Sequence, residues 1–276
     1  MRLVALLTCH NRKQKTLKCL SSLFAIKSDC DVFLVDDGST DGTADAVHAA
    51  YPSVNVIKGD GNLFWSRGMY TAWKQAVSEG YDFYLWLNDD IELKCFFLEE
   101  LFSCYDLLGG NCVVSGLIGS PDGKSVIYGG SSANKKMLGE ATQPQEVTFL
   151  NGNAVLVPAS VVGRIGILDP FYHHDLGDVD YGLLARRNGI KVVTTRKIIA
   201  TGTPNPQCRI REWGVTLSQR FRKLNSPLGS PLRMNYYFRR KNYSIFNAVA
   251  FCSYLVVLNV LPDAVISALF GVKYKK

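Results

Sequence analysis

Hydrophobic and polar positions alternate between two patterns over the first hundred residues. Short apolar runs typical of buried strands are followed by amphipathic stretches with a helical period. The predicted strands are Leu3 to Thr8, Val32 to Val35, Val54 to Lys58 and Phe83 to Leu87. The predicted helices are Lys13 to Phe24, Thr43 to Ala50 and Ser66 to Glu79. This alternation favours βαβ units and a mostly parallel sheet, in which ligands bind beyond the carboxyl ends of the strands.

The pattern changes after a helix predicted from Phe96 to Leu107. A Gly-rich stretch up to Ser132 predicts a hairpin region. The other predicted elements are strands at 113–118, 147–157 and 191–194 and a short helix at 159–165. We therefore expect an α/β fold with a mostly parallel, in part mixed, central sheet flanked by helices.

Polar side chains follow the predicted strands where each one ends. Those at the strand ends are Thr8, Asp36, Asp37, Asp89 and Asp90. In FLVDDGSTDGT (33–43), carboxylates at a strand tip can accept hydrogen bonds from a base edge or from ribose hydroxyls. In GDGNLFWSRGM (59–69), Trp65 and Arg67 lie at the start of a predicted helix. A guanidinium at a helix N-terminus can bind a diphosphate, and an indole can pack on the face of a sugar. The alternative is that Trp65 is core and Arg67 a solvated charge.

The stretch YLWLNDDIEL (84–93) ends an apolar run on Asn88, Asp89 and Asp90. Taken alone, these residues are typical of a turn or a helix N-cap. Asn88 and Asp90 are the first and third members of a D-x-D-like triplet, and alternate residues of an extended chain point the same way. Asp90 is therefore predicted to ligate Mg²⁺ or Mn²⁺, with Asn88 or Asp89 assisting.

A second group of acids follows in DLGDVDYGLLARR (175–187), which leads into a helix. Asp178 can be a simple helix cap or a functional carboxylate, with Asp180 close behind. The preceding His173 and His174 are possible ligands or proton carriers, although adjacent histidines in an aromatic loop are more often packing or surface residues.

In this order and spacing, these segments resemble a family-2 glycosyltransferase of the GT-A fold over roughly residues 3 to 200. GNLFWSRGM, FLNGNAVLVP and YHHDLGDVDYGLLARRNG look like bacterial surface-polysaccharide enzymes of the rhamnosyltransferase-like kind. The resemblance implies an inverting transfer from a nucleoside-diphosphate sugar, UDP- or dTDP-linked, to a glycan or lipid-linked acceptor. Asp178 would be the catalytic base, Asp180 the fallback, and Asp90 with Asn88 the metal ligands.

The same resemblance implies two further groups of site residues. The nucleotide-sugar group is Thr8, Asn11, Arg12, Asp36, Asp37, Gly61, Asn62, Trp65, Arg67 and Asp89. The acceptor group is Asn151, Gly152, His173 and His174. The chain departs from the family pattern in three places. Asn88 begins the triplet, Gly177 replaces a Glu, and no histidine follows His174.

The charge is distributed unevenly between the two parts of the chain. The 276 residues are 47% hydrophobic with a net charge of +7. Residues 1–181 carry 14 basic and 22 acidic residues (−8), whereas residues 182–276 carry 17 and 2 (+15). A basic part suits anionic lipid, a diphosphate or nucleic acid, and no nucleic-acid module is recognisable. We expect a glycosyltransferase domain at 1–205, with a nucleotide half (1–110) and an acceptor half (111–205), and a basic helical region at 206–276.

The apolar segment 244–272 is the candidate for membrane contact. A spanning helix needs about 20 mostly apolar residues. Asn247, Asn259, Pro262 and Asp263 interrupt this one, so interfacial helices are favoured, with a soluble subdomain as the alternative. Basic flanks favour an anionic cytoplasmic leaflet.

The cysteines and the first residues bear on the compartment. The 8 cysteines are scattered without a CxxC pair, which fits a reducing cytosol. The first apolar run turns polar at Thr8 and is expected to be a strand rather than a signal peptide. We expect a cytoplasmic protein at the inner face of the membrane.

Two other functions compete with glycosyl transfer. A sugar-nucleotide pyrophosphorylase would need a Gly-rich basic loop after the first strand, and Thr8 to Lys13 contains no glycine. A non-catalytic glycan-binding protein could keep the fold, but the presence of both Asp90 and Asp178 argues against it.

Overall fold

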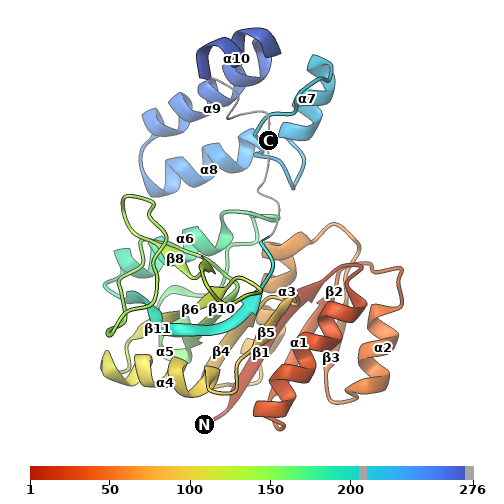
Figure 1. The fold of residues 1–276 in the computed structure, drawn as a ribbon, viewed down its shortest axis with the longest axis vertical. Coiled ribbons are helices and arrows are strands. Elements are labelled where there is room, and N and C mark those ends of the chain that lie inside the picture. The colour runs from red at the N-terminus through yellow and green to blue at the C-terminus, as the bar shows by residue number, and fades with distance from the viewer. Residues whose placement is uncertain (205–209, 271–276) are drawn as a thin grey trace. The chain divides into compact units, whose positions relative to one another are not determined.

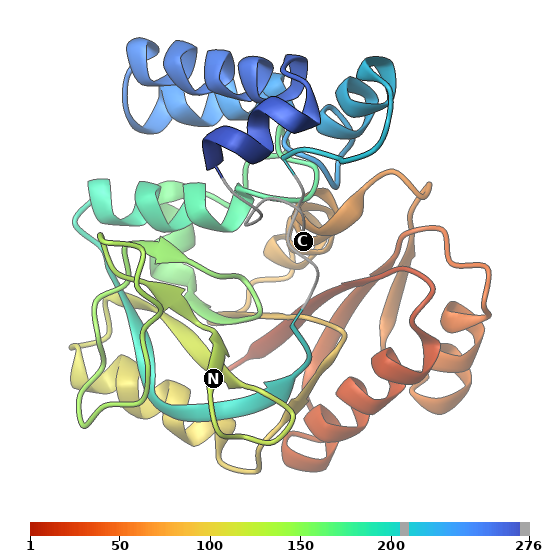
Figure 2. The ribbon, with the colours of Figure 1, turned by 45° about the horizontal axis from the view of Figure 1, so that its top comes forward.

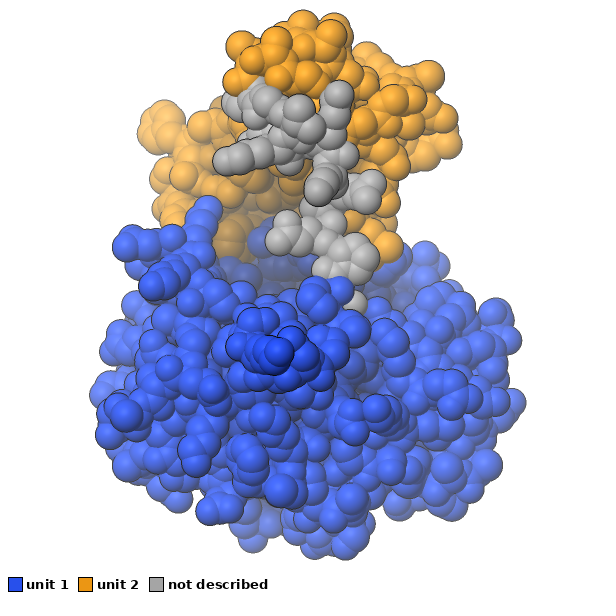
Figure 3. Space-filling view, viewed as in Figure 1, with its two compact units in different colours: residues 1–204 blue, residues 205–276 orange. Residues whose placement is uncertain are grey.

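The computed structural model describes residues 1–204 and 210–270. The chain divides into two compact units, Met1–Pro204 and Asn205–Lys276, which are coloured separately in Figure 3. The first unit contains all the strands of the described residues and every candidate site residue.

A mixed nine-stranded sheet forms the centre of the first unit (Figure 1). Its parallel part is β3 (Asn55–Lys58), β2 (Asp31–Asp36), β1 (Leu3–Cys9) and β4 (Phe83–Leu87), in that order. The sheet continues through β10 (Ala154–Pro158), β6 (Cys112–Gly119), β11 (Lys191–Gly202) and β5 (Ile91–Leu93), with β7 (Val126–Tyr128) paired to β6. A small second sheet pairs β8 (Gly130–Ser131) with β9 (Phe149–Leu150).

Helices cover both faces of the sheet (Figure 2). One face carries α1 (Lys13–Ile26), α2 (Thr43–Ala50) and α4 (Phe97–Leu107); the other carries α3 (Phe64–Val77), α5 (Ala159–Ile165) and α6 (Gly177–Arg187). The sequence of β1 dictates this arrangement. Leu3, Ala5 and Leu7 pack into the first core, and the alternate Val4 and Leu6 pack into the second. A strand apolar on both sides is buried on both faces, as in other parallel sheets.

Three strands differ from the sequence prediction. The strand predicted at 147–157 is interrupted between β9 and β10 by the turn Asn151-Gly152-Asn153. β11 is much longer than predicted, because its continuation pairs with β6 through bulges and then with β5. β5 was not predicted, since three residues after a turn carry too little periodicity.

The second unit is helical in its described residues. It contains α7 (Leu217–Leu224), α8 (Leu232–Asn242), α9 (Ile245–Val260) and α10 (Asp263–Phe270). Asp263, the first residue of α10, forms ion pairs with Arg211 and Arg220. The distance from Arg220 Nη2 to Asp263 Oδ1 is 3.0 Å. Among the described helices, none is long and apolar enough by itself to cross a bilayer. α9 and α10 together have the required length and apolarity, but the pair is bent by 120°. Residues 271–272 of the predicted apolar segment lie outside the described residues.

Candidate active site

The candidate residues gather at one edge of the sheet, where β1, β2 and β4 end. β10 runs antiparallel to β4, with Ala154 opposite Leu87, so the turn before β10 reaches the same edge. The first turn of α6 also lies there, because Gly152 contacts Asp178. The topology thus brings together segments that are more than a hundred residues apart in the sequence.

Asp37 shapes the turn that leads into α3. Its Oδ1 accepts the N–H groups of Gly61 (2.9 Å) and Leu63 (3.2 Å), and its Oδ2 accepts that of Phe64 (2.8 Å). The side chain is buried, at 4% exposure. Phe64 has a φ of +56°, an uncommon conformation for an aromatic residue, which these bonds hold in place. Both carboxylate oxygens of Asp37 therefore accept hydrogen bonds from the backbone of this turn. The predicted contact with a nucleoside would not be their only role.

The other residues of the predicted nucleotide group flank this turn. Asp36 accepts the N–H of Ser39 at 3.0 Å, and Asn11 accepts that of Thr40 at 2.7 Å. Thr8 lies under α3, where a Cβ on Gly68 would come within 2.3 Å of its hydroxyl. Asn62 lies exposed in the turn after Gly61. Thr8 and Asp36 lie at the ends of β1 and β2, whereas Asn62 lies in the loop between β3 and α3.

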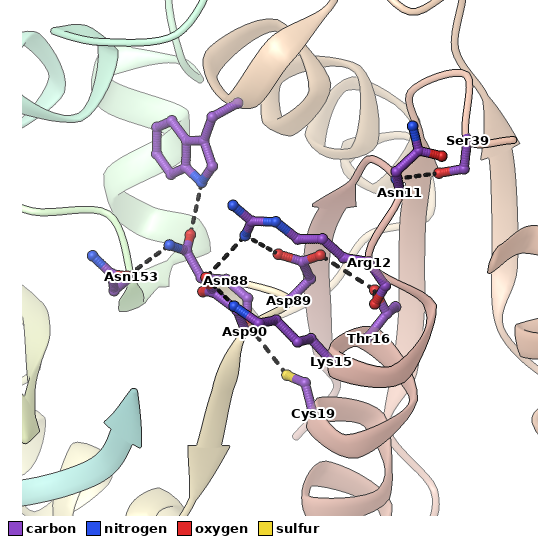
Figure 4. A network of polar contacts seen from close by, with 11 residues as sticks. Asn11, Arg12, Lys15, Thr16, Cys19, Ser39, Asn88, Asp89, Asp90 and Asn153 are labelled. Carbon is purple, nitrogen blue, oxygen red and sulfur yellow. Dashed lines mark hydrogen bonds and ion pairs between the residues drawn. The ribbon is translucent and has the colours of Figure 1, made fainter. Parts of the chain in front are cut away.

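One guanidinium nitrogen joins the two acids of the NDD triplet (Figure 4). Arg12 Nη1 lies 3.0 Å from Asp89 and 2.9 Å from Asp90, and Lys15 lies 4.0 Å from Asp90. Asp89 also accepts the Thr16 hydroxyl at 3.2 Å. Burial raises the pKa of Asp89 to about 6, against the lowering effect of Arg12.

Asn88 points away from these acids, contrary to the strand-alternation prediction. Its amide oxygen accepts the indole N–H of Trp65 at 2.8 Å, and its amide nitrogen donates to Asn153 at 2.6 Å. The reason is that β4 ends at Leu87 and the triplet forms a turn before β5, so the period of two does not apply. Asp89 and Asp90 face the same guanidinium instead (Figure 4).

This donor set fits a divalent ion only in part. Mg²⁺ and Mn²⁺ are commonly held by one or two carboxylates together with substrate phosphates. Asp90 supplies a carboxylate of the right kind, but its Oδ2 accepts Arg12 in the structure, and the oxygen of Asn88 is occupied by Trp65. Within residues 1–204 and 210–270, no cluster of three or more His, Cys, Asp or Glu side chains could hold a metal ion. An ion here would therefore depend on the phosphates of a bound nucleotide.

Asp178 lies in the first turn of α6 and is not its N-cap, which is Leu176. Its Oδ2 accepts the N–H of Gly152 at 2.9 Å and its Oδ1 that of Val179 at 2.8 Å. Burial raises its pKa to about 6, while the two N–H bonds act in the opposite direction. Asp180, the fallback base, is buried at 2% exposure. As a residue, Asp178 is thus more exposed than Asp180.

The histidine pair lies between α3 and α6. The His173 carbonyl accepts the N–H groups of Ser66 and Arg67, at 2.9 and 3.3 Å, and Arg67 Nε donates to the Pro170 carbonyl at 3.0 Å. His174 packs edge-on against Phe64 and has a buried Nδ1 without a hydrogen-bond partner. Burial lowers the pKa of His174, and the charge of Arg12 acts in the same direction. Burial thus favours the neutral imidazole of His174, against the charge of Asp175, whereas Arg67 is turned toward the 170–173 loop.

Sequence analysis missed three residues of these networks, which are Lys15, Thr16 and Asn153. Asn153 bonds to Asn88 and to Asn151, and Thr16 bonds to Asp89. Thr16 could have been found, since it lies one helical turn after Arg12 on α1. Asn153 could not, because its approach depends on the antiparallel direction of β10.

Comparisons with known proteins agree with this fold. Residues 5–165 match the family model of glycosyl transferase family 2. N-acetylglucosaminyl-diphospho-decaprenol L-rhamnosyltransferase of Mycobacterium tuberculosis is 28% identical over 197 residues, which cover 59% of this chain and 63% of that protein. The chain thus spans less than two thirds of the length of this curated relative.

Solved glycosyltransferase structures share the fold. Residues 1–349 of TarS from S. aureus superpose with a TM-score of 0.57 at 16% identity, covering 90% of this chain and 71% of that one. The mannosyltransferase PcManGT from Pyrobaculum calidifontis, solved with GDP-Man and Mn²⁺, gives 0.54 at 16% identity, covering 97% and 79%. These likenesses show a curled mixed sheet of the GT-A type. Since the family model also covers more than half of its residues, the chain belongs to glycosyl transferase family 2.

Proposed function

We propose that this glycosyltransferase moves a sugar from a nucleoside diphosphate to an acceptor hydroxyl with inversion at the anomeric carbon. The observation that carries the proposal is the carboxylate of Asp178, oriented by two backbone N–H groups beside the edge where β1, β2 and β4 end. A pKa of about 6 leaves this group ionised at neutral pH and yet more basic than an ordinary aspartate.

In the proposed reaction the acceptor oxygen attacks the anomeric carbon as the bond from that carbon to the diphosphate oxygen breaks. The acceptor proton passes to Asp178, and the electron pair of the broken bond leaves with the nucleoside diphosphate. A divalent ion held by Asp90 and the phosphates would neutralise charge on the leaving group. Arg12 and Lys15 place two further positive charges at the same edge.

We propose a UDP- or dTDP-sugar as donor and a glycan or lipid-linked acceptor in bacterial surface polysaccharide synthesis. The mycobacterial relative is named for L-rhamnosyl transfer to a diphospho-decaprenol-linked sugar. TarS has been solved with UDP-GlcNAc and PcManGT with GDP-Man. GDP-sugars are therefore the alternative donors against which UDP- and dTDP-sugars are tested.

Nucleoside diphosphate release tests this function. The purified chain is incubated with UDP-, dTDP- and GDP-sugars, with and without Mn²⁺ and with a polyprenyl-diphosphate-sugar acceptor. We expect acceptor-dependent release of a nucleoside diphosphate from one donor class. Formation of sugar-1-phosphate and nucleoside triphosphate in the presence of pyrophosphate would favour a pyrophosphorylase, and donor binding without any product would favour a glycan-binding protein.

We also propose that the second unit binds the anionic surface of the cytoplasmic face of the membrane, where a lipid-linked acceptor would be found. At the start of α9, Ile245, Phe246 and Val249 are exposed, Phe246 at 83%. The exposed cations Arg240 and Lys241 lie immediately before them in the chain. Apolar side chains next to cations suit an interface with anionic lipid.

Vesicle sedimentation tests this contact. We expect Phe246→Glu to weaken binding of the chain to vesicles containing phosphatidylglycerol by about tenfold, since an aromatic anchor is replaced by a like charge. Leu107→Glu is the matched control, because Leu107 is an exposed apolar residue of the first unit, at 54%. Equal sedimentation of the wild type with phosphatidylglycerol and with neutral vesicles would overturn the proposal.

A further inference from the structure

Trp65 lies between the NDD turn and the carboxylate of Asp178. Its indole N–H donates to Asn88 at 2.8 Å, and the Asn88 amide continues to Asn153 at 2.6 Å. The backbone follows the same path, because the N–H of Asn88 donates to the Asn153 carbonyl at 2.8 Å. The turn that contains Gly152 is thus tied to the end of β4 by a side-chain bond and a backbone bond.

The far edge of the indole also rests on Gly152. A Cβ placed on Gly152 would lie 2.3 and 2.5 Å from the outer ring carbons of Trp65, and 3.3 Å from the Cβ of Asp178. Only glycine fits there, and the resulting close approach brings the Gly152 N–H to 2.9 Å from Asp178 Oδ2. The ring itself is braced edge-to-face by Trp86, with centroids 6.2 Å apart.

We infer that Trp65 is a positioning residue for Asp178. Its N–H fixes Asn88, its ring holds Gly152, and Gly152 in turn orients the carboxylate that removes the acceptor proton. This inference rests on the proposed function of Asp178 and replaces the expectation that Trp65 is a platform for the donor sugar. The indole N–H is already bonded and part of the ring is covered by Gly152.

The two roles of Trp65 predict different kinetics. A sugar platform contributes to donor binding, so its loss raises KM and leaves the base unchanged. A positioning residue acts on the chemical step, and a misplacement of about 1 Å can lower a rate on the order of a hundredfold. Loss of the Gly152 N–H bond also removes a contact that favours the ionised carboxylate, so the acid limb of the rate profile moves to higher pH.

The experiment compares Trp65→Phe and Gly152→Ala with the wild type, using initial rates from pH 5 to 8. Phenylalanine at position 65 lacks the indole N–H and the outer ring carbons. Alanine at position 152 leaves Trp65 in place, but its Cβ would push the 151–153 turn away from the indole ring. We expect both variants to lower kcat about tenfold to a hundredfold with little change in the KM of the donor. Both should move the acid limb to higher pH. Gly163→Ala in α5 is the matched control, since no atom lies within 4 Å of an added Cβ there.

Each outcome decides the inference. A raised donor KM with unchanged kcat and an unmoved pH profile in Trp65→Phe would overturn it in favour of the sugar platform. An unmoved profile in Gly152→Ala, in protein whose unfolding transition matches the wild type, would also overturn it. If the wild type itself releases no nucleoside diphosphate, the proposed function has failed, which is a distinct result.

Discussion

Replacing Asp178 with asparagine is expected to lower kcat by about 10²–10⁴-fold while donor binding is retained. The amide keeps the size of the carboxylate and can still accept the Gly152 N–H, but it cannot take up the acceptor proton. In the wild type, the rate should rise with pH through about 6, where Asp178 loses its proton. The measurement is acceptor-dependent nucleoside diphosphate release, together with donor binding by calorimetry.

Asp175→Asn provides the control for Asp178→Asn. Asp175 lies three residues earlier and its side chain is 47% exposed, so its neutralisation changes the local charge without removing the proposed base. Its kcat is expected to stay within a few-fold of the wild type. Full turnover by Asp178→Asn would refute the assignment, and a matching loss in Asp180→Asn alone would transfer it to the fallback residue.

Replacing Asp37 with alanine is expected to lower the free energy of unfolding by about 3 kcal/mol or more. The substitution removes a buried carboxylate that accepts three backbone N–H groups of a half-buried turn, and a hydrogen bond to a charged group contributes about 1.5–3 kcal/mol. The positive φ of Phe64 would also lose its restraint. Urea unfolding monitored by circular dichroism measures the change.

Asp60→Ala is the control for this second substitution. Asp60 is exposed in the same turn and accepts one N–H, that of Asn62, at 2.9 Å. Its loss is expected to change stability by about 0.5 kcal/mol or less. If Asp37→Ala unfolds at the same urea concentration as Asp60→Ala, the turn does not depend on the carboxylate.

Much of the first unit could be predicted from its sequence because its strands are short, apolar and separated by regular helical patterns. The pattern placed Asp37 and Asp90 at strand ends, and the structure brings those ends together. The resemblance to family 2 added the pairing with Asp178, which no local pattern could supply.

The errors have a common physical cause. The orientation of Asn88 depends on where β4 stops forming hydrogen bonds, and a one-residue difference turns a side chain to the opposite side. The engagement of Trp65 with Gly152 depends on an antiparallel strand, β10, that begins at Ala154, far later in the sequence. Local propensity reveals neither of these two arrangements. Charge pairing was missed for a similar reason, because Arg12 reaches Asp89 only after the sheet has formed.

The direction of β10 has a consequence for changing acceptor preference by design. The turn at 151–153 is held between β9 and β10, so an inserted residue would shift the register of a strand paired on both sides. The turn at 121–124 between β6 and β7 is exposed, and an added Cβ on Gly123 would meet no atom within 4 Å. Loop grafts into residues 111–205, the proposed acceptor half, therefore belong at the second turn, whereas the first tolerates substitution only at constant length.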